Sequence, residues 1–361
     1  MRGIRSMKLP RWAYIVAVAL SITMLAVGCG SPSSDSKQVQ QPTIQSKSYF
    51  IFDTMVTVKL YDDPAYAQHF EHILNIMKDI ESKMSRTLET SELYKLNTHA
   101  GKGPYQVSDE TFMVIEKALD YAEKTNGRFD PTIGPLVSLW GIGTEQARVP
   151  AQAEIDEALK LVGYDTVTLD AANKTVSMAK PGMELDLGGI GKGYAADAIV
   201  DYIREQGVKS AIIDLGGNIY AVGTKPAGFD WTIGVQDPNE TRGNQIGTMK
   251  IKDRTIVTSG VYERYLEHNG QYYHHILDPK TGYPAKSNLN SVTIVTDRST
   301  DADALSTSAF ALGVEEGIAF IEAKPNAEAI FITEDKQVYT TSGIPSFFTL
   351  TDDAYKYKFN K

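Results

Sequence analysis

The chain has 361 residues, 42% of them hydrophobic and 22% charged, which suits a globular protein with a sizeable core and excludes a disordered or fibrous chain. The net charge is −9 at pH 7, and it becomes −13 when residues 1–28, with four basic and no acidic side chains, are removed. Because so acidic a chain repels a phosphate backbone, we expect no nucleic-acid partner.

The N-terminus is predicted to be a lipoprotein signal peptide, residues 1–28. Basic residues precede an apolar run from Ala13 to Val27, which is shorter than the roughly 20 residues of a membrane-spanning helix. The run ends in a sequence that resembles a lipobox, although Leu25 stands one position earlier than the usual leucine. Cys29 follows as the only cysteine of the chain, which excludes a disulfide framework, and we expect it to carry the lipid anchor.

Residues 29–48 are predicted to be a flexible tether, because Ser, Gln, Lys and Pro dominate them and apolar residues are few. Residues 49–361 would then form one catalytic domain, since no further linker interrupts them. With a lipid anchor at Cys29, we expect this domain at the cell membrane, on its extracytoplasmic face.

The domain is predicted to begin with a strand and a helix. Phe50 to Leu60 contains alternating β-branched residues typical of a strand. Apolar residues at helical spacing predict a helix from Ala67 to Met84, and two histidines on its other side, His69 and His72, are expected to be solvated.

A helix capped by Ser108 and ending near Thr125 comes next. Between residues 127 and 141, three glycines and two prolines exclude a regular helix or a central strand, so we expect a shaped loop. Pro150 opens another helix, and residues 166–178 predict a hairpin.

A glycine-rich segment, residues 184–206, predicts a short strand, a turn and a helix. This arrangement binds anions at the helix N-terminus, and Lys192 adds a full positive charge. The spacing Gly191-x-Gly193-x-x-Ala196 also satisfies the dinucleotide fingerprint, with Asp214 about twenty residues later. A Rossmann-type oxidoreductase is therefore an alternative, as are purely structural glycine turns.

Residues 258–284 hold the densest group of side chains able to move protons or bind phosphate. Arg264 offers a planar fork of donors suited to phosphate or carboxylate. His274 and His275 are two of only six histidines, and because strand residues face alternate sides, we expect one of them to face a site.

The same segment contains two predicted turns. Asp278-Pro279-Lys280-Thr281-Gly282 predicts a tight turn that would present Asp278 and Thr281 from a rigid corner. Asn269-Gly270 between tyrosine-rich runs predicts a hairpin. A surface hairpin with a polar tip, without a functional site, is therefore the alternative for the segment.

The C-terminal part is predicted to contain a strand at residues 292–295, a helix ending near Glu322 and a closing hairpin. On that helix Asp303 and Thr307 stand four residues apart and share one face. Hard oxygen ligands of this kind suit Mg²⁺. Spacing alone favours a structural role, with Asp303 as a first-turn charge and Thr307 bonded to its own backbone.

Taken together, these segments resemble the signature of the ApbE family, the FAD:protein FMN transferases. The resemblance covers roughly residues 50–345. The motifs that carry it are Phe52-Asp53-Thr54, residues 128–141, 184–197 and 214–218, Thr258-Ser259-Gly260, Tyr262-x-Arg264, residues 275–284 and residues 303–307. Helical and strand-like segments intermix without a long βαβ repeat, so we expect a single α+β domain of mixed, mainly antiparallel sheets flanked by helices.

The resemblance implies Mg²⁺-dependent transfer of FMN from FAD to a Thr or Ser hydroxyl of an acceptor protein, with AMP as the leaving group. It implies Mg²⁺ ligands at Asp303, Thr307 and the carbonyl of Gly189. His275 is our choice as the general base, with Asp278 orienting it and His274 as the alternative. The residues expected to bind FAD are Gly191, Lys192, Gly193, Thr258, Ser259, Gly260, Tyr262, Arg264 and Thr281.

Two other activities fit the same motifs. An FAD diphosphatase would release free FMN and AMP, and a non-catalytic lipoprotein would only bind the flavin. For a transferase, the family expectation for the acceptor is a subunit of an extracytoplasmic, membrane-bound redox complex.

Overall fold

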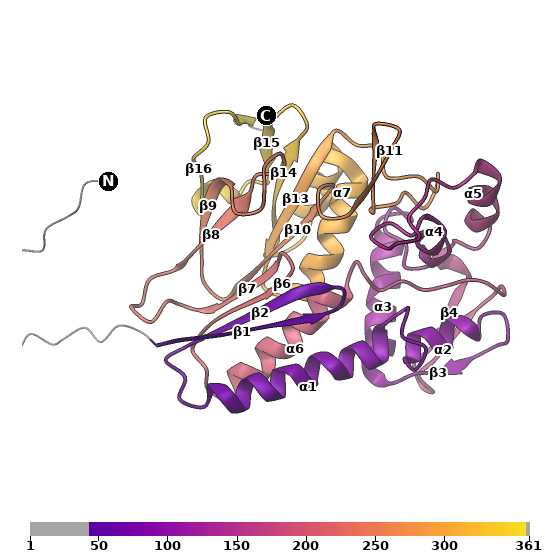
Figure 1. Ribbon diagram of the computed structural model, residues 1–361, viewed down its shortest axis with the longest axis horizontal. Helices are drawn as coiled ribbons and strands as arrows, with labels where there is room; N and C mark the ends of the chain where they lie inside the picture. The colour runs from indigo at the N-terminus through magenta and orange to yellow at the C-terminus, as the bar shows by residue number, and fades with distance from the viewer. Residues whose placement is uncertain (1–42, 359–361) are drawn as a thin grey trace, which may run out of the picture. The chain divides into compact units, whose positions relative to one another are not determined.

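The computed structural model describes residues 43–358, so Cys29, the predicted signal peptide and most of the predicted tether lie outside the described residues. The described part is built on a nine-stranded sheet with the order β1-β2-β6-β7-β10-β13-β14-β15-β17 (Figure 1). Its strands are Ile44–Ile51 (β1), Thr54–Tyr61 (β2), Ser210–Leu215 (β6), Asn218–Gly223 (β7), Arg254–Gly260 (β10), Leu289–Thr296 (β13), Glu328–Thr333 (β14), Gln337–Thr340 (β15) and Lys356–Lys358 (β17).

Neighbouring strands of this sheet are antiparallel, apart from the parallel pair β15 and β17. The mainly antiparallel α+β fold is confirmed, and the doubly wound parallel sheet of a Rossmann-type oxidoreductase is excluded. The strand predicted before the glycine-rich turn is wrong as well, since Glu184 forms only an isolated bridge to Ile133. Polar and glycine residues follow Leu185, and they do not favour a regular ladder of strand hydrogen bonds there.

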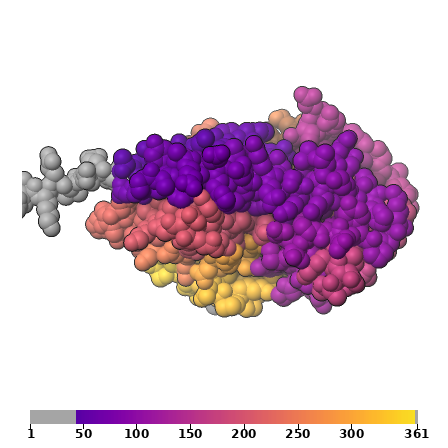
Figure 2. Space-filling model, turned by 90° about the horizontal axis from the view of Figure 1, so that it is seen from below, coloured from indigo at the N-terminus to yellow at the C-terminus, as the bar shows by residue number. Residues whose placement is uncertain are grey.

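Three long helices cover one face of the sheet: Tyr66–Met84 (α1), Gly191–Glu205 (α6) and Ser299–Glu322 (α7). α7 packs on β10 and β13, α6 packs on β6 and β7, and α1 lies beside α6. Figure 2 shows the underside of the molecule, where the indigo N-terminal residues run alongside the red α6–β6 region. By length and apolar content α7 could cross a membrane, but its packing is that of a core helix.

A smaller sheet covers the other face with the order β16-β9-β8, formed by Phe348–Leu350, Gln245–Ile251 and Trp231–Gln236. Its apolar residues pack on the outer side of β7, β10, β13 and β14. Every residue of β13 is therefore buried. This double coverage packs β10 and β13 tightly on both faces.

The remaining elements lie outside these two sheets and the three long helices. They are Glu92–Thr98 (α2), Asp109–Lys124 (α3), Gly134–Trp140 (α4), Gln152–Leu159 (α5), the small sheet of Tyr105–Gln106 (β3), Val167–Asp170 (β4) and Thr175–Met178 (β5), the hairpin Tyr265–His268 (β11) and Gln271–His274 (β12), and the 3₁₀ turns Tyr164–Thr166 and Ile344–Ser346. The predicted tip of the β11–β12 hairpin is confirmed, with Asn269 and Gly270 both at positive φ.

Two predictions near the N-terminus are wrong. The tether was expected to extend to residue 48, but β1 begins at Ile44 and pairs with β2 along its whole length. The backbone pairing, together with Tyr49 packed against α1, orders a segment whose side chains are mostly polar. The second wrong prediction is that His69 is solvated. It is only 6% exposed, and its Nδ1 bonds to the hydroxyl of Tyr202 on α6 at 3.0 Å.

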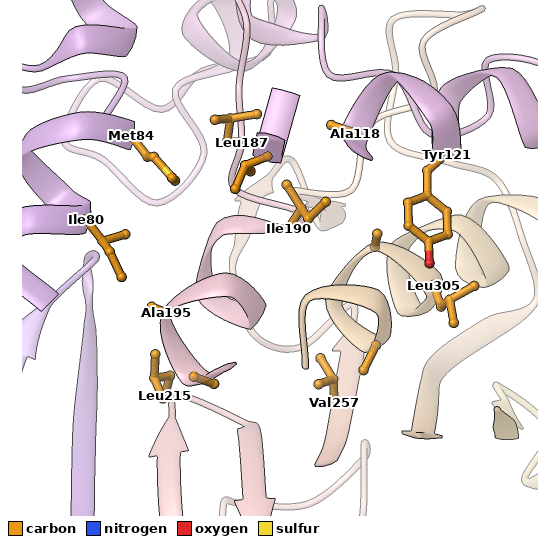
Figure 3. Packing of buried hydrophobic residues seen from close by; sticks show 14 of the residues in the cluster. Ile80, Met84, Ala118, Tyr121, Leu187, Ile190, Ala195, Leu215, Val257 and Leu305 are labelled. Carbon is orange, nitrogen blue, oxygen red and sulfur yellow. The ribbon is translucent and has the colours of Figure 1, made fainter. Parts of the chain in front are cut away.

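α6 and α7 approach each other closely, and Gly193 makes this possible. Its Cα lies so near α7 that a β-carbon would stand 2.1 Å from the carbonyl oxygen of Ser299. Asp197, one turn further along α6, accepts hydrogen bonds from the backbone N–H groups of Ser299 and Thr300 and so caps α7. Apolar side chains fill the core beneath the contact of α6 with α7. Ile190 and Leu305 are among those shown in Figure 3.

We predict that Gly193→Ala lowers the free energy of unfolding by roughly 1–3 kcal/mol, the usual range for forcing extra atoms into a packed interior. Urea denaturation measures the change. Gly191→Ala is the matched control, because a β-carbon there meets nothing within 4 Å. Alanine favours helix over glycine by about 0.5–1 kcal/mol, so the control should be neutral or stabilising. Equal losses in both variants would contradict the packing explanation.

Candidate functional site

A large open cavity of about 1850 Å³ lies between the sheet, α6, α7 and the β11–β12 hairpin. Most of the motif segments singled out in the sequence contribute to its wall: residues 52–54, 128–131, 186–189, 191–192, 257–260, 262–264 and 275–277 with Pro279, together with Asp303 and Thr307 from α7. Ligand pockets of ordinary size measure about 300–1,000 Å³, so this cavity can hold a large substrate and part of a second molecule.

The end of β10 supplies one wall. Thr258 Oγ1 bonds to Thr293 on β13 at 2.9 Å, and Ser259 Oγ bonds to Ser306 on α7 at 2.8 Å. Because these hydroxyls are held by rigid neighbours, their positions at the cavity are fixed before any ligand enters.

Tyr262 lies against Gly260, where a β-carbon would stand 2.6 Å from its ring. The residue at position 260 must therefore be glycine for the tyrosine to fold back against the strand. Burial raises the pKa of Tyr262, so the phenol is neutral and presents an aromatic face and a hydroxyl to the cavity.

A cluster of oxygen atoms surrounds the first turns of α7. Asp303 is 3% exposed, and its Oδ2 accepts the backbone N–H of Gly193 at 2.9 Å. Its Oδ1 lies 3.5 Å from Lys192 Nζ. Thr307 Oγ1 lies 3.5 Å from Ser259 Oγ and would be 3.4 Å from a β-carbon on Gly189. The predicted metal residues are thus brought together.

The composition of this cluster restricts what it can bind. Among residues 43–358, no group of three or more His, Cys, Asp or Glu side chains could hold a metal ion. A cation here would be held by one carboxylate, a hydroxyl and backbone carbonyls, all hard oxygen donors. That donor set fits Mg²⁺, which keeps several waters, and does not fit zinc or copper.

The start of α6 offers fewer free backbone donors than expected for an anion site. The N–H of Gly191 donates to the carbonyl of Leu187 at 2.7 Å, and the N–H of Gly193 donates to Asp303. Two of the first-turn amides are therefore already used within the protein. The side chain of Lys192, which also donates to the carbonyl of Gly188 at 3.0 Å, is left as the main cation at this helix end.

The two adjacent histidines point in different directions. His274 is half-buried, edge-on against Phe310 of α7, and its Nε2 lies 3.2 Å from the carbonyl of Ala285. His275 lines the cavity, and its Nδ1 lies 3.1 Å from the carbonyl of Arg264. A carbonyl can only accept, so Nδ1 carries the proton and Nε2 is free to accept one.

Electrostatics keep the imidazole of His275 neutral. Burial lowers its pKa to about 4, and the nearby positive charges of Arg264 and Lys192 act in the same direction. Burial also lowers the pKa of His274. Both rings are therefore uncharged at neutral pH, and only that of His275 faces the cavity.

Arg264 stands at the mouth of the cavity. Its guanidinium donates to the carbonyl of Asp53 at 3.0 Å, in the turn between β1 and β2. This contact joins two segments more than 200 residues apart and leaves the remaining guanidinium N–H groups for a ligand.

Three predicted site residues do not reach the cavity wall. Asp278 accepts the N–H of Lys280 at 2.7 Å and lies 3.7 Å from Arg128, so its carboxylate is not oriented toward His275. Thr281 is exposed and accepts the N–H of Tyr283 within the turn. Gly193 packs on α7. All three hold backbone or helices in place.

The sequence reasoning missed two parts of the wall. One is the loop between β8 and β9, from Gln236 to Arg242, and the other is the ion pair between Arg86 and Asp186, at 3.0 Å, beside the glycine-rich turn. Asn218 at the start of β7 also lines the cavity, although its turn was noted only as a motif. Polar loops carry no hydrophobic periodicity, so no repeating pattern in the sequence pointed to the loop between β8 and β9.

Comparison with known proteins places these features in a family. The model of the ApbE family matches residues 52–331. A Treponema pallidum protein named FAD:protein FMN transferase is 38% identical, over 83% of this chain and 87% of its own length. A Klebsiella pneumoniae protein of the same name is 37% identical, over 87% and 96%.

Solved structures agree with the sequence relatives. The crystal structure of the ApbE protein of Thermotoga maritima matches with a TM-score of 0.77 and 37% identity, over 84% of this chain and 99% of that one. The flavin transferase ApbE of Vibrio cholerae matches with a TM-score of 0.77 and 28% identity, over 85% and 99%.

Proposed function

The chain belongs to the ApbE family, and from this membership we infer that it is an FAD:protein FMN transferase. The observation that carries the inference at the level of residues is the convergence of Lys192, Asp303 and His275 on one cavity. Phosphoryl transfer requires charge neutralisation, alignment and a proton acceptor, and these side chains are suited to those tasks.

We propose that Asp303, Thr307 and the carbonyl of Gly189 hold Mg²⁺. A carboxylate that is 3% exposed is costly unless a cation faces it, and Lys192 at 3.5 Å only partly fulfils that need. When bound, Mg²⁺ would neutralise charge on the FAD diphosphate and withdraw electrons from the bond that breaks.

Lys192 and Arg264 are proposed to bind the rest of the diphosphate charge. Lys192 is 30% exposed at its side chain, so its ammonium can turn from Asp303 to an incoming phosphate. Thr258 and Ser259 present fixed hydroxyls beside them. These contacts would align the phosphorus of the FMN half with the hydroxyl of the acceptor.

His275 is proposed to be the general base. A Thr or Ser hydroxyl of the acceptor protein would attack the phosphorus of the FMN half, its proton would pass to Nε2 of His275, and AMP would leave as the phosphoanhydride bond breaks. The same arrangement would accept water in place of the hydroxyl, which would release free FMN.

The place of action is also a proposal. We infer that Cys29 is lipidated and that the domain acts at the extracytoplasmic face of the cell membrane, where a redox-complex subunit would be its acceptor. The support is the basic and apolar leader before the single cysteine.

Asp303→Asn should lose transfer activity while keeping the fold, because the amide can still accept from Gly193 but cannot balance a divalent cation. Excess EDTA should abolish the wild-type reaction. The assay incubates enzyme, FAD, Mg²⁺ and a candidate redox subunit, and reads flavin fluorescence on the acceptor band and free FMN by chromatography. Asp301→Asn is the matched control, since that carboxylate on the same helix pairs with Lys117. Full transfer in EDTA would rule out the metal role.

The assay also separates the three activities considered for this cavity. Flavin on the acceptor band indicates transfer, and free FMN without labelled acceptor indicates hydrolysis. Unchanged FAD that stays bound would mean that the protein only carries the flavin.

His275→Asn should bind FAD but transfer FMN about 10²- to 10⁴-fold more slowly, the usual range for losing general-base catalysis. His274→Asn should do much less, because that ring faces Phe310. Since the pKa of His275 is lowered to about 4, wild-type kcat/KM should hold from pH 7 down to about pH 5. A dead His274→Asn with an active His275→Asn would reverse the assignment.

Cys29→Ala should leave the protein without its lipid and release it from the membrane, or leave the leader uncleaved. Fractionation of cells labelled with a radioactive fatty acid measures this. A processed, lipid-labelled variant still in the membrane fraction would show that another residue carries the anchor.

A further inference from the structure

The C-terminal segment contacts the β8–β9 loop through one buried side chain, Tyr355. It is 3% exposed, and its ring belongs to the apolar cluster beneath the small sheet. Its hydroxyl donates to Asp237 Oδ1 at 2.5 Å and accepts from Asn239 Nδ2 at 2.8 Å. Asp237 and Asn239 belong to the β8–β9 loop, which lies more than 100 residues earlier in the chain.

This loop forms one wall of the cavity. Pro238, Asn239, Glu240, Thr241 and Arg242 all line it. The loop is itself mostly exposed from residue 239 onward, so it has little packing of its own to hold it. Its position therefore depends on the polar contacts at its base.

Asn239 is held from three sides. Its backbone N–H donates to Asp237 Oδ1 at 2.8 Å, and its side-chain amide donates to Tyr355. Its Oδ1 accepts from Asn290 Nδ2 at 3.1 Å. The carbonyl of Asn290 accepts the N–H of Val261 at 3.0 Å, next to Tyr262. One chain of hydrogen bonds thus runs from the C-terminal segment to two walls of the cavity.

Loss of the contact between Tyr355 and Asp237 would cost free energy. Asp237 is 4% exposed, and a buried carboxylate that loses a donor retains its desolvation penalty. Burial and the hydrogen bond to this carboxylate raise the pKa of Tyr355, so the phenol keeps its proton at neutral pH and can donate it to Asp237.

We propose that Tyr355 is a positioning residue for the substrate cavity, which acts through Asp237 and Asn239 to hold the β8–β9 loop and the Val261–Tyr262 segment where FAD is bound. The identity of the ligand rests on the proposed function. Tyr355 does not line the cavity, so its hydroxyl would affect the binding of FAD and not the chemical step.

Tyr355→Phe tests this, because it removes one oxygen and keeps the ring in the core. In the full-length chain with Mg²⁺, titration of FAD followed by its fluorescence should give a Kd about 3- to 10-fold higher than wild type, the range expected from the loss of a hydrogen bond. The turnover rate at saturating FAD should change less than twofold. Tyr220→Phe is the control, since that tyrosine is 2% exposed and its hydroxyl bonds to the carbonyl of Asp297, away from the cavity.

Two further variants separate positioning from a general loss of stability. If Tyr355 acts through Asn239, Tyr355→Phe combined with Asn239→Ala should be no worse than Asn239→Ala alone. Asn290→Ala, which breaks the same network from β13, should raise the Kd for FAD in the same way and serves if Tyr355→Phe folds poorly. Unchanged Kd values, additive losses, or an equal rise in Tyr220→Phe would overturn the proposal. A wild-type chain that binds no FAD would instead overturn the proposed function.

Discussion

The site depends on the contact between α6 and α7 at Gly193 and Asp303. The carboxylate of Asp303 accepts the N–H of Gly193 while its other oxygen faces Lys192. One side chain therefore joins the two helices and places a negative charge in the cavity wall. Because a β-carbon at Gly193 would collide with α7, the helices can come this close only with glycine there. The geometry of this part of the site is thus set by core packing.

The sequence predicted well those parts of the site that lie on regular elements. Asp303 and Thr307 share a helix face because helical spacing places them there, and the choice of His275 over His274 agrees with the alternation of a strand end. The prediction was poorer where a residue type has two uses. Gly193 was assigned to FAD binding and Asp278 to the orientation of His275, but Gly193 permits helix packing, and Asp278 holds a turn and lies beside Arg128.

The loop between β8 and β9 could not be predicted from the sequence, and the reason is physical. Its role depends on hydrogen bonds from Tyr355 and Asn290, which come from distant parts of the chain. No local pattern encodes such pairing. His69 illustrates the same limit, since it lies off the apolar stripe of α1 and is nevertheless buried by Tyr202 of another helix.

The low pKa of His275 bears on how this residue would work as the proposed base. At an ordinary pKa near 6.5, about three quarters of the imidazole would already be neutral at pH 7, so lowering the pKa to about 4 adds little of the competent form. It does make the base weaker. A weak base is sufficient where the transition state is loose, because the attacking hydroxyl then forms little bond to phosphorus and keeps its proton until late. In the proposed mechanism, the burden of catalysis would fall on the cations that neutralise and align the diphosphate. The same positive charges that depress the pKa of His275, those of Arg264 and Lys192, are the ones suited to that work.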